Sequence, residues 1–140
     1  ALVMASCSSP NTLDVRPMHL RNREIADEEE AMIRGEQRRL FHGAIGVREQ
    51  EQCLGHYYTV LWRNDEVGEP VEVRFEYQQG ESGSRVLTKT QTFDGSMKKG
   101  RAEFRIIGDD YLKKGRVLAW RCSLWRGGRE IEHRQSYLWE

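Results

Sequence analysis

Two small groups of residues have the types that chemistry at an active site requires. Asp109 and Asp110 are adjacent acids beside Gly108, an arrangement that suits a catalytic acid pair or a calcium site. Cys122 faces His133 if the last two strands form a hairpin, which pairs a thiol nucleophile with a base. The simpler interpretations are a polar turn for the acids and a packed thiol beside a hydrogen-bonded imidazole. We prefer these interpretations, so no catalytic residue is expected and a small hydrolase is the third alternative function.

The sequence contains no motif for binding a metal, a phosphate group or a nucleic acid. The four histidines, at positions 19, 42, 56 and 133, do not have the spacing of metal ligands, and no dense Cys/His cluster occurs. No phosphate loop or serine nucleophile motif occurs. Lys plus Arg and Asp plus Glu both number 22, so the net positive field that broad nucleic-acid binding needs is absent. We expect no metal, no cofactor and no nucleic-acid partner.

A band of tryptophan and arginine near the C-terminus is the main candidate for a binding face. It consists of Trp120, Arg121, Trp125, Arg126 and Arg134. Both residue types are enriched in binding hot spots because they combine large area with directed donors. A partner carboxylate, a lipid phosphate or an acidic group of peptidoglycan would fit this band. The alternative is a ladder of cation–π contacts and salt bridges that stiffens a solvated sheet.

The band belongs to an expected C-terminal hairpin with a two-residue turn at Gly127-Gly128. Counting outward from the turn fixes which residues face each other across the two strands. The expected pairs are Arg126 with Arg129, Leu124 with Ile131, Cys122 with His133, Trp120 with Gln135, and Arg121 with Arg134. A slip of one residue would exchange the two faces of the hairpin.

The elements that position these groups are one helix and then a series of strands. Residues 23–42 are expected to form an amphipathic helix that ends at Gly43, because apolar residues recur at helical spacing. After Gly43 the period changes to two, most clearly in Val71–Tyr77. The expected strands are Ala44–Glu51, His56–Arg63, Val71–Tyr77, Ser84–Phe93, Ala102–Ile106, Val117–Trp125 and Glu130–Trp139. Residues 43–140 are therefore predicted to form an antiparallel β-sandwich or barrel.

From Ala44 to Glu140, the count and order of these strands resemble immunoglobulin-like or fibronectin-like sandwiches. Tyr111 is similar to the tyrosine that often precedes the penultimate strand of that fold. The resemblance implies a mainly β, seven-stranded, immunoglobulin-like antiparallel sandwich preceded by one α-helix. Small sandwiches of this kind are common binding modules, but the fold alone does not supply an activity.

The first seven residues resemble the end of a bacterial signal peptide. Met4-Ala5-Ser6-Cys7 is similar to the lipobox of bacterial lipoproteins, in which the cysteine receives lipid and becomes the mature N-terminus. The resemblance implies lipidation of Cys7 and a place on the periplasmic face of the cell envelope, with the outer membrane expected. Residues 8–22 are then a flexible tether. The alternative is an apolar terminus with a chance cysteine.

The chain has three cysteines, an odd number for an exported protein. Lipidation of Cys7 leaves Cys53 and Cys122, either as a disulfide or as two separate buried thiols. Taken together, the patterns predict a lipid-anchored, non-catalytic binding or structural module. Its expected partners are the membrane, through Cys7, and another envelope protein or a cell-wall component. A carbohydrate-binding module that uses Trp125 and nearby aromatic rings as stacking platforms is the second alternative.

Overall fold

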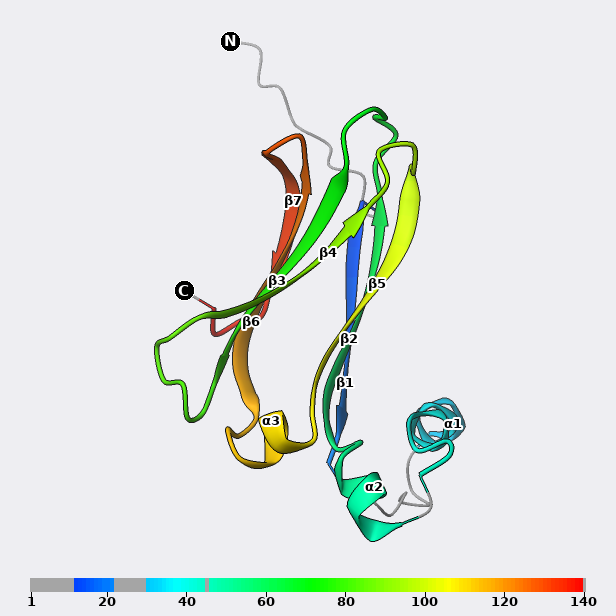
Figure 1. The fold of residues 1–140 in the computed structure, drawn as a ribbon, viewed down its shortest axis with the longest axis vertical. Coiled ribbons are helices and arrows are strands. Elements are labelled where there is room, and N and C mark those ends of the chain that lie inside the picture. Colours follow the sequence, from blue (N-terminus) through cyan, green and yellow to red (C-terminus); the bar gives the residue numbers. More distant parts are fainter. Residues whose placement is uncertain (1–11, 22–29, 45, 140) are drawn as a thin grey trace.

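The computed structural model of the chain describes residues 12–21, 30–44 and 46–139. Within these ranges seven strands form two antiparallel sheets, with strand orders β1-β2-β5 and β4-β3-β6-β7 (Figure 1). The elements are β1 (Leu13–Leu20), α1 (Ala31–Leu40), α2 (Val47–Glu51), β2 (Gly55–Arg63), β3 (Val71–Gln79), β4 (Leu87–Phe93), β5 (Lys99–Ile107), α3 (Asp109–Leu112), β6 (Val117–Arg126) and β7 (Arg129–Gln135). The predicted mainly β, antiparallel two-sheet architecture is confirmed.

The two sheets share one hydrophobic core. Strand β3 alternates buried and half-buried residues along its whole length, so one face points to the core and the other toward solvent. Phe75 of β3 is fully buried, and its ring centroid lies 4.4 Å from that of Tyr58 and 5.3 Å from that of Phe104. Because Tyr58 and Phe104 belong to the other sheet, this aromatic cluster joins the two sheets.

Strand β1 corrects the prediction that residues 8–22 are a tether. Leu13–Leu20 pairs with β2 along its full length, and Leu13 and Leu20 are each only 1% exposed. The prolines suggested an irregular segment, but Pro17 lies on a strand at the edge of its sheet, where the missing N–H is tolerated. Among the described residues, the two-sheet domain therefore includes β1 and does not begin at residue 43.

The helix expected at 23–42 is present over its second half, as α1 (Ala31–Leu40); residues 22–29 lie outside the described part of the chain. The expected stop is also present, because Gly43 has φ of 82°. No side chain of α1 is fully buried, and Met32 is 86% exposed. Only its C-terminal end, with Leu40 and then Phe41, packs against a small cluster at the end of the three-stranded sheet.

The expected first strand, Ala44–Glu51, is wrong, because Val47–Glu51 forms the short helix α2. Its sequence, Val-Arg-Glu-Gln-Glu, contains mostly good helix formers and only one β-branched residue. The count of seven strands still holds, since β1 takes the place of this segment. The predicted number of strands is correct, but the segment predicted as the first strand is not one of them.

The register of the last hairpin corrects the expected pairs. Arg126 pairs with Arg129, and Trp125 pairs with Glu130, as a two-residue turn requires. A β-bulge then shifts the register, and the following pairs are Leu124 with Glu132, Ser123 with His133, Cys122 with Arg134, and Arg121 with Gln135. The extra residue, Ile131, packs against the core, which gives a physical reason for the bulge.

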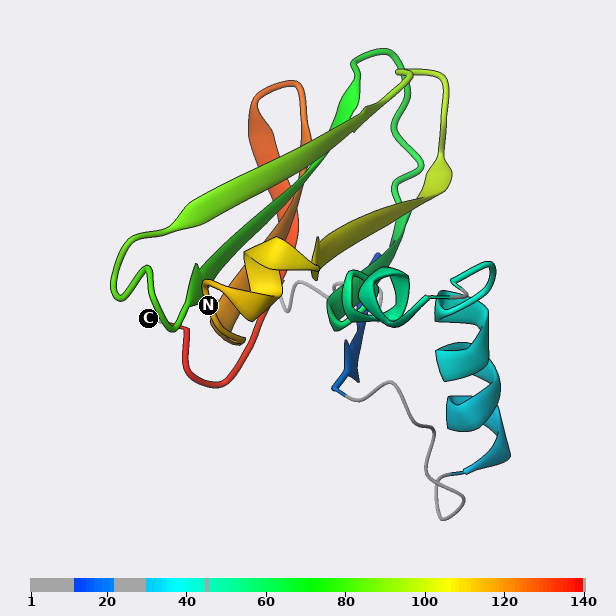
Figure 2. The ribbon, with the colours of Figure 1, turned by 60° about the horizontal axis from the view of Figure 1, so that its bottom comes forward.

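All three helices lie at the same end of the sandwich, the end that β1 reaches at Leu20 (Figure 1). Figures 1 and 2 both show α1 and α2 beside the three-stranded sheet, on the side away from the four-stranded sheet. The opposite end carries the start of β1 and the turns between β2 and β3, β4 and β5, and β6 and β7. The two ends of the sandwich therefore differ in structure.

Candidate functional site

The five residues of the predicted Trp/Arg binding face do not share one face. Trp120 points into the core, where its ring centroid lies 5.8 Å from that of Tyr58 and 6.0 Å from that of Phe75. Arg126 is on the same inner side and is only 4% exposed. Arg121 and Trp125 lie on the outer face of the sheet, as their alternation along β6 requires. The five residues therefore lie on strands, as predicted, but their side chains are divided between the two faces of the sheet.

Arg126 has a structural role at the end of the sandwich opposite the helices. Its guanidinium donates hydrogen bonds to the carbonyl oxygens of Glu69, Gly95 and Met97, at 3.0, 3.1 and 2.9 Å. These carbonyls belong to the connection between β2 and β3 and the turn between β4 and β5. One buried side chain thus fastens two connections to β6, and its charge is not available to a partner.

The outer face of the four-stranded sheet is a ladder of matched charges. Arg121 lies between two acids, with N···O distances of 3.7 Å to Glu76 and 2.5 Å to Glu130. The guanidinium of Arg74 sits 4.4 Å from the ring centroid of Trp125. These contacts match the alternative interpretation of the band, a ladder of salt bridges and cation–π contacts that stiffens the sheet.

Arg134 does not lie opposite Arg121, since the bulge places it across from Cys122. It forms an ion pair with Glu132, at 2.9 Å. The expected pairing of Arg121 with Arg134 is therefore wrong.

The four tryptophans do not form a row of exposed rings. Trp62 is 2% exposed, Trp120 points inward, and Trp125 is covered by Arg74. Trp139, beyond the last strand, is half-buried. Stacking platforms for a sugar need coplanar rings open to solvent, and these positions do not provide them.

The thiol of Cys122 and the imidazole of His133 do not meet. Cys122 is fully buried on the inner face, and burial raises the pKa of its thiol to about 12. His133 pairs instead with Ser123, whose neighbours Cys122 and Leu124 lie on the opposite face. The hairpin therefore holds no thiol–base pair, since a nucleophilic cysteine needs an accessible thiolate.

The two acids of the 109–110 pair lie in α3, where each faces a lysine one turn later. The carboxylate of Asp109 lies 3.8 Å from Lys113, and that of Asp110 lies 3.7 Å from Lys114. Gln52 also donates to Asp109, at 3.1 Å. The described residues contain no group of three or more acids, histidines or cysteines that would hold a metal ion.

Cys53 and Cys122 are both free, so the disulfide considered for them is absent. Cys122 belongs to the core between the sheets, whereas Cys53 packs with the cluster near the helices. The alternative of two separate thiols is the correct one. Cys7 lies outside the described residues, and its lipidation stays a prediction.

Two histidines are stacked at the helical end of the sandwich, although the sequence predicts no role for them. His19 of β1 pairs with His56 of β2, and their ring centroids are 4.0 Å apart. The Nε2 atom of His19 is 2.8 Å from the hydroxyl of Tyr111, and the backbone N–H of Val117 donates to Nε2 of His56 at 3.0 Å. The pairing of His19 with His56 depends on the register of β1, a segment for which the sequence predicts a tether.

Burial and nearby positive charge lower the pKa of both stacked imidazoles. The pKa of His56 is lowered to about 4, first by burial and then by the positive charges of His19, Arg21 and Arg116. The pKa of His19 is lowered by burial, Arg21 and Arg116. Arg21 also donates from Nε to Nδ1 of His19, at 3.1 Å, which leaves the proton of the neutral ring on Nε2. The arrangement closes this end of the sandwich by hydrogen bonds.

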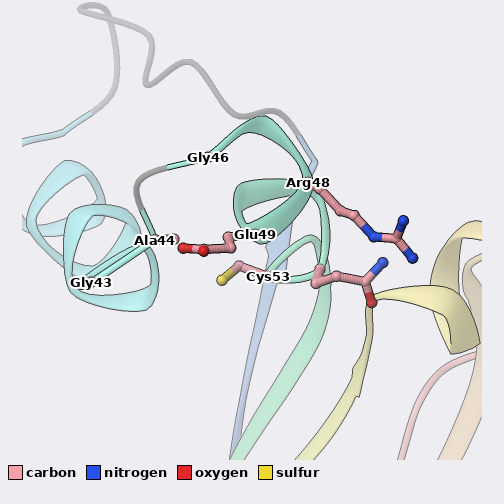
Figure 3. Close-up of a pocket in the computed structure, with 7 residues that line it drawn as sticks. Gly43, Ala44, Gly46, Arg48, Glu49 and Cys53 are labelled. Carbon is pink, nitrogen blue, oxygen red and sulfur yellow. The ribbon is translucent and has the colours of Figure 1, made fainter.

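Two open cavities meet at Cys53, beside the helices. The first, shown in Figure 3, encloses about 610 Å³. Its lining residues are Gly43, Ala44, Gly46, Arg48, Glu49, Gln52 and Cys53. The thiol of Cys53 and the side chain of Glu49 lie on the side of α2 that faces Ala44, whereas Arg48 points away (Figure 3). The lining is largely apolar, with few directed polar groups.

The second cavity, here named the basic pocket, encloses about 630 Å³ between the end of α1 and the three-stranded sheet. Its lining residues are Gly35, Arg38, Arg39, Leu40, His42, Cys53, Tyr57, Arg105 and Ile107. Three arginines and a histidine line this cavity, and its lining includes no carboxylate. The basic pocket was not predicted, because α1 and β5 are far apart in the sequence.

Comparison of the chain with family models, curated proteins and solved structures found no match. In the described part of the chain, no helix has the length and apolar character needed to cross a membrane.

Proposed function

We propose that this chain is a non-catalytic binding module of the bacterial cell envelope, held at the periplasmic face of the outer membrane by lipid on Cys7. The support for the anchor is the lipobox-like stretch Met4-Ala5-Ser6-Cys7. More than one acyl chain is needed for stable anchoring, at ~0.8 kcal/mol for each buried methylene.

The observation that carries the proposal is the direction of β1. The strand begins at Leu13, so the chain from Cys7 to the fold spans six residues and reaches at most ~22 Å. It then runs the length of the sandwich to Leu20, about 25 Å away, where the three helices lie. An anchored domain would hold the helical end and the basic pocket away from the lipid, in reach of another component of the envelope.

The proposal of a non-catalytic role is supported by the state of the candidate reactive groups. Cys122 is buried, the acids of α3 face lysines, and the stacked histidines are hydrogen-bonded within the fold. The proposal also includes an immunoglobulin-like or fibronectin-like type of sandwich. It is supported by the division of seven strands into sheets of three and four, with the chain passing between sheets from β2 to β3, from β4 to β5 and from β5 to β6.

The test of the anchor is metabolic labelling with a fatty-acid analogue in cells that express the natural gene. The wild-type protein is expected to carry the label, and Cys7→Ala is expected to lose it. Cys53→Ala is the matched control, because it removes another accessible thiol and should keep the label. Label retained by Cys7→Ala, or absent from the wild type, would contradict the anchor.

A further inference from the structure

We infer that the basic pocket is a binding site for a small organic anion, a phosphate or carboxylate attached to an apolar group. The pocket itself stands on the geometry of the fold. Only its orientation, away from the membrane, rests on the proposed function.

Positive charge converges on the basic pocket from two separate parts of the chain. Arg38 and Arg39 come from the last turn of α1, whereas Arg105 comes from β5. Basic residues near a helix C-terminus are common, because they compensate the helix dipole. This explanation covers the two arginines of α1 but not Arg105, which reaches the same cavity from β5 and lies over the ring of Tyr57.

These positive charges are incompletely paired within the protein. Arg39 is hydrogen-bonded to Glu36, while Arg105 has a longer contact with Glu103, at 3.4 Å, and lies 5.9 Å from the ring centroid of Tyr57. Arg38 forms no ion pair with any described residue. Guanidinium groups gathered around a cavity repel one another, and an anion between them relieves this repulsion. The planar fork of arginine matches the oxygens of a carboxylate or phosphate.

Part of the lining of the basic pocket is apolar. Leu40 and Ile107 pack with Tyr57 in the cluster at this end of the sheet. Tyr57 is 4% exposed, and its hydroxyl donates to the carbonyl of Cys53, so the tyrosine is a fixed wall. A volume of about 630 Å³ lies within the usual range for small-molecule sites. The pocket thus suits a ligand with one anionic group and one apolar group.

A soluble ligand is favoured over the headgroup of the anchoring lipid layer. The basic pocket lies at the end of the sandwich that β1 reaches at Leu20, and the anchored end is the other one. A headgroup of the same membrane would have to reach past the whole length of the sheet.

The test is calorimetric titration of the 140-residue chain with phenyl phosphate, with phenol as the neutral analogue. We expect saturable binding of phenyl phosphate and none of phenol. Arg38→Gln combined with Arg105→Gln should weaken binding at least about tenfold, because each change removes a charged hydrogen-bond donor. Arg85→Gln combined with Arg129→Gln removes the same charge from exposed positions and should bind as the wild type does.

A parallel arm uses vesicles that contain phosphatidylglycerol, and circular dichroism checks that each variant is folded. Absence of saturable binding to phenyl phosphate would overturn the inference, as would equal affinity of a folded Arg38/Arg105 variant. Binding to vesicles alone, lost in the same variant, would also overturn it in favour of a lipid headgroup. These outcomes are independent of lipid on Cys7, so the pocket and the anchor can fail separately.

Discussion

The imidazole rings of His19 and His56 stack at a centroid distance of 4.0 Å and join β1 to β2 at the helical end of the sandwich. Through Tyr111 and Val117 the pair also contacts α3 and the start of β6. The groups that bear on the pair include the positive charges of Arg21 and Arg116. This cluster is therefore a point at which both sheets and the connection between β5 and β6 meet.

This contact predicts a loss of stability in weak acid. The pKa of His56 is lowered to about 4 in the folded protein, compared with about 6.5 in the unfolded chain. Its contribution is complete above pH 6.5 and is lost as the pH falls toward 4, because only the unfolded chain then binds the proton. Urea unfolding at several pH values should show this fall, and His56→Gln should flatten it between pH 6.5 and 4.5. An unchanged slope in that variant would contradict the role of His56.

Arg126 predicts a large effect from one buried side chain. Arg126→Met leaves three carbonyl oxygens without their donor, so we expect a loss of about 3 kcal/mol in the free energy of unfolding. Arg129→Met is the control at an exposed position of the same hairpin and should change stability by less than about 0.5 kcal/mol. Urea denaturation measures both, and equal effects of the two changes would show that Arg126 does not fasten the connections.

The thiols of Cys53 and Cys122 should differ sharply in reactivity. In a Cys7→Ala background, a disulfide-exchange reagent should react with Cys53 in the folded protein and with Cys122 only after unfolding. Cys53 is half-buried, whereas Cys122 is fully buried and its pKa is raised to about 12. Thiol counts with and without urea give the answer; two thiols that stay silent in urea would indicate a disulfide instead.

The outer ladder predicts an effect on stability. Arg121→Glu places a third acid between Glu76 and Glu130, and we expect a loss of about 1–2 kcal/mol from repulsion. Arg85→Glu, which makes the same charge change at an exposed position, should alter stability by less than about 0.5 kcal/mol. Thermal unfolding measures the loss of stability in each of the two variants. A matched loss in the control would mean that the ladder contributes nothing specific.

Much of the sheet structure followed from local patterns. The alternation in Val71–Tyr77 predicted a strand with one buried face, and β3 has that pattern. The turn at Gly127-Gly128 was also correct, because both glycines have positive φ, at 60° and 74°, as a tight hairpin turn requires. These features depend on residues close together in the sequence.

The errors arose where distant contacts decide the structure. Pro17 made the segment of β1 resemble an irregular tether. The strand is regular because it pairs with β2, and its own sequence does not indicate this pairing. The bulge at Ile131 changed every later pair of the hairpin, because one extra residue shifts the register. The basic pocket depends on Arg38 and Arg105, which only the packing of α1 beside β5 brings together.

The most direct test of the central proposal is the intact mass of the protein extracted from membranes of cells that express the natural gene. Our account predicts a mature N-terminus at Cys7 with the added mass of at least two acyl chains on that residue. A mature protein with an unmodified Cys7 thiol, recovered without the membrane, would contradict it.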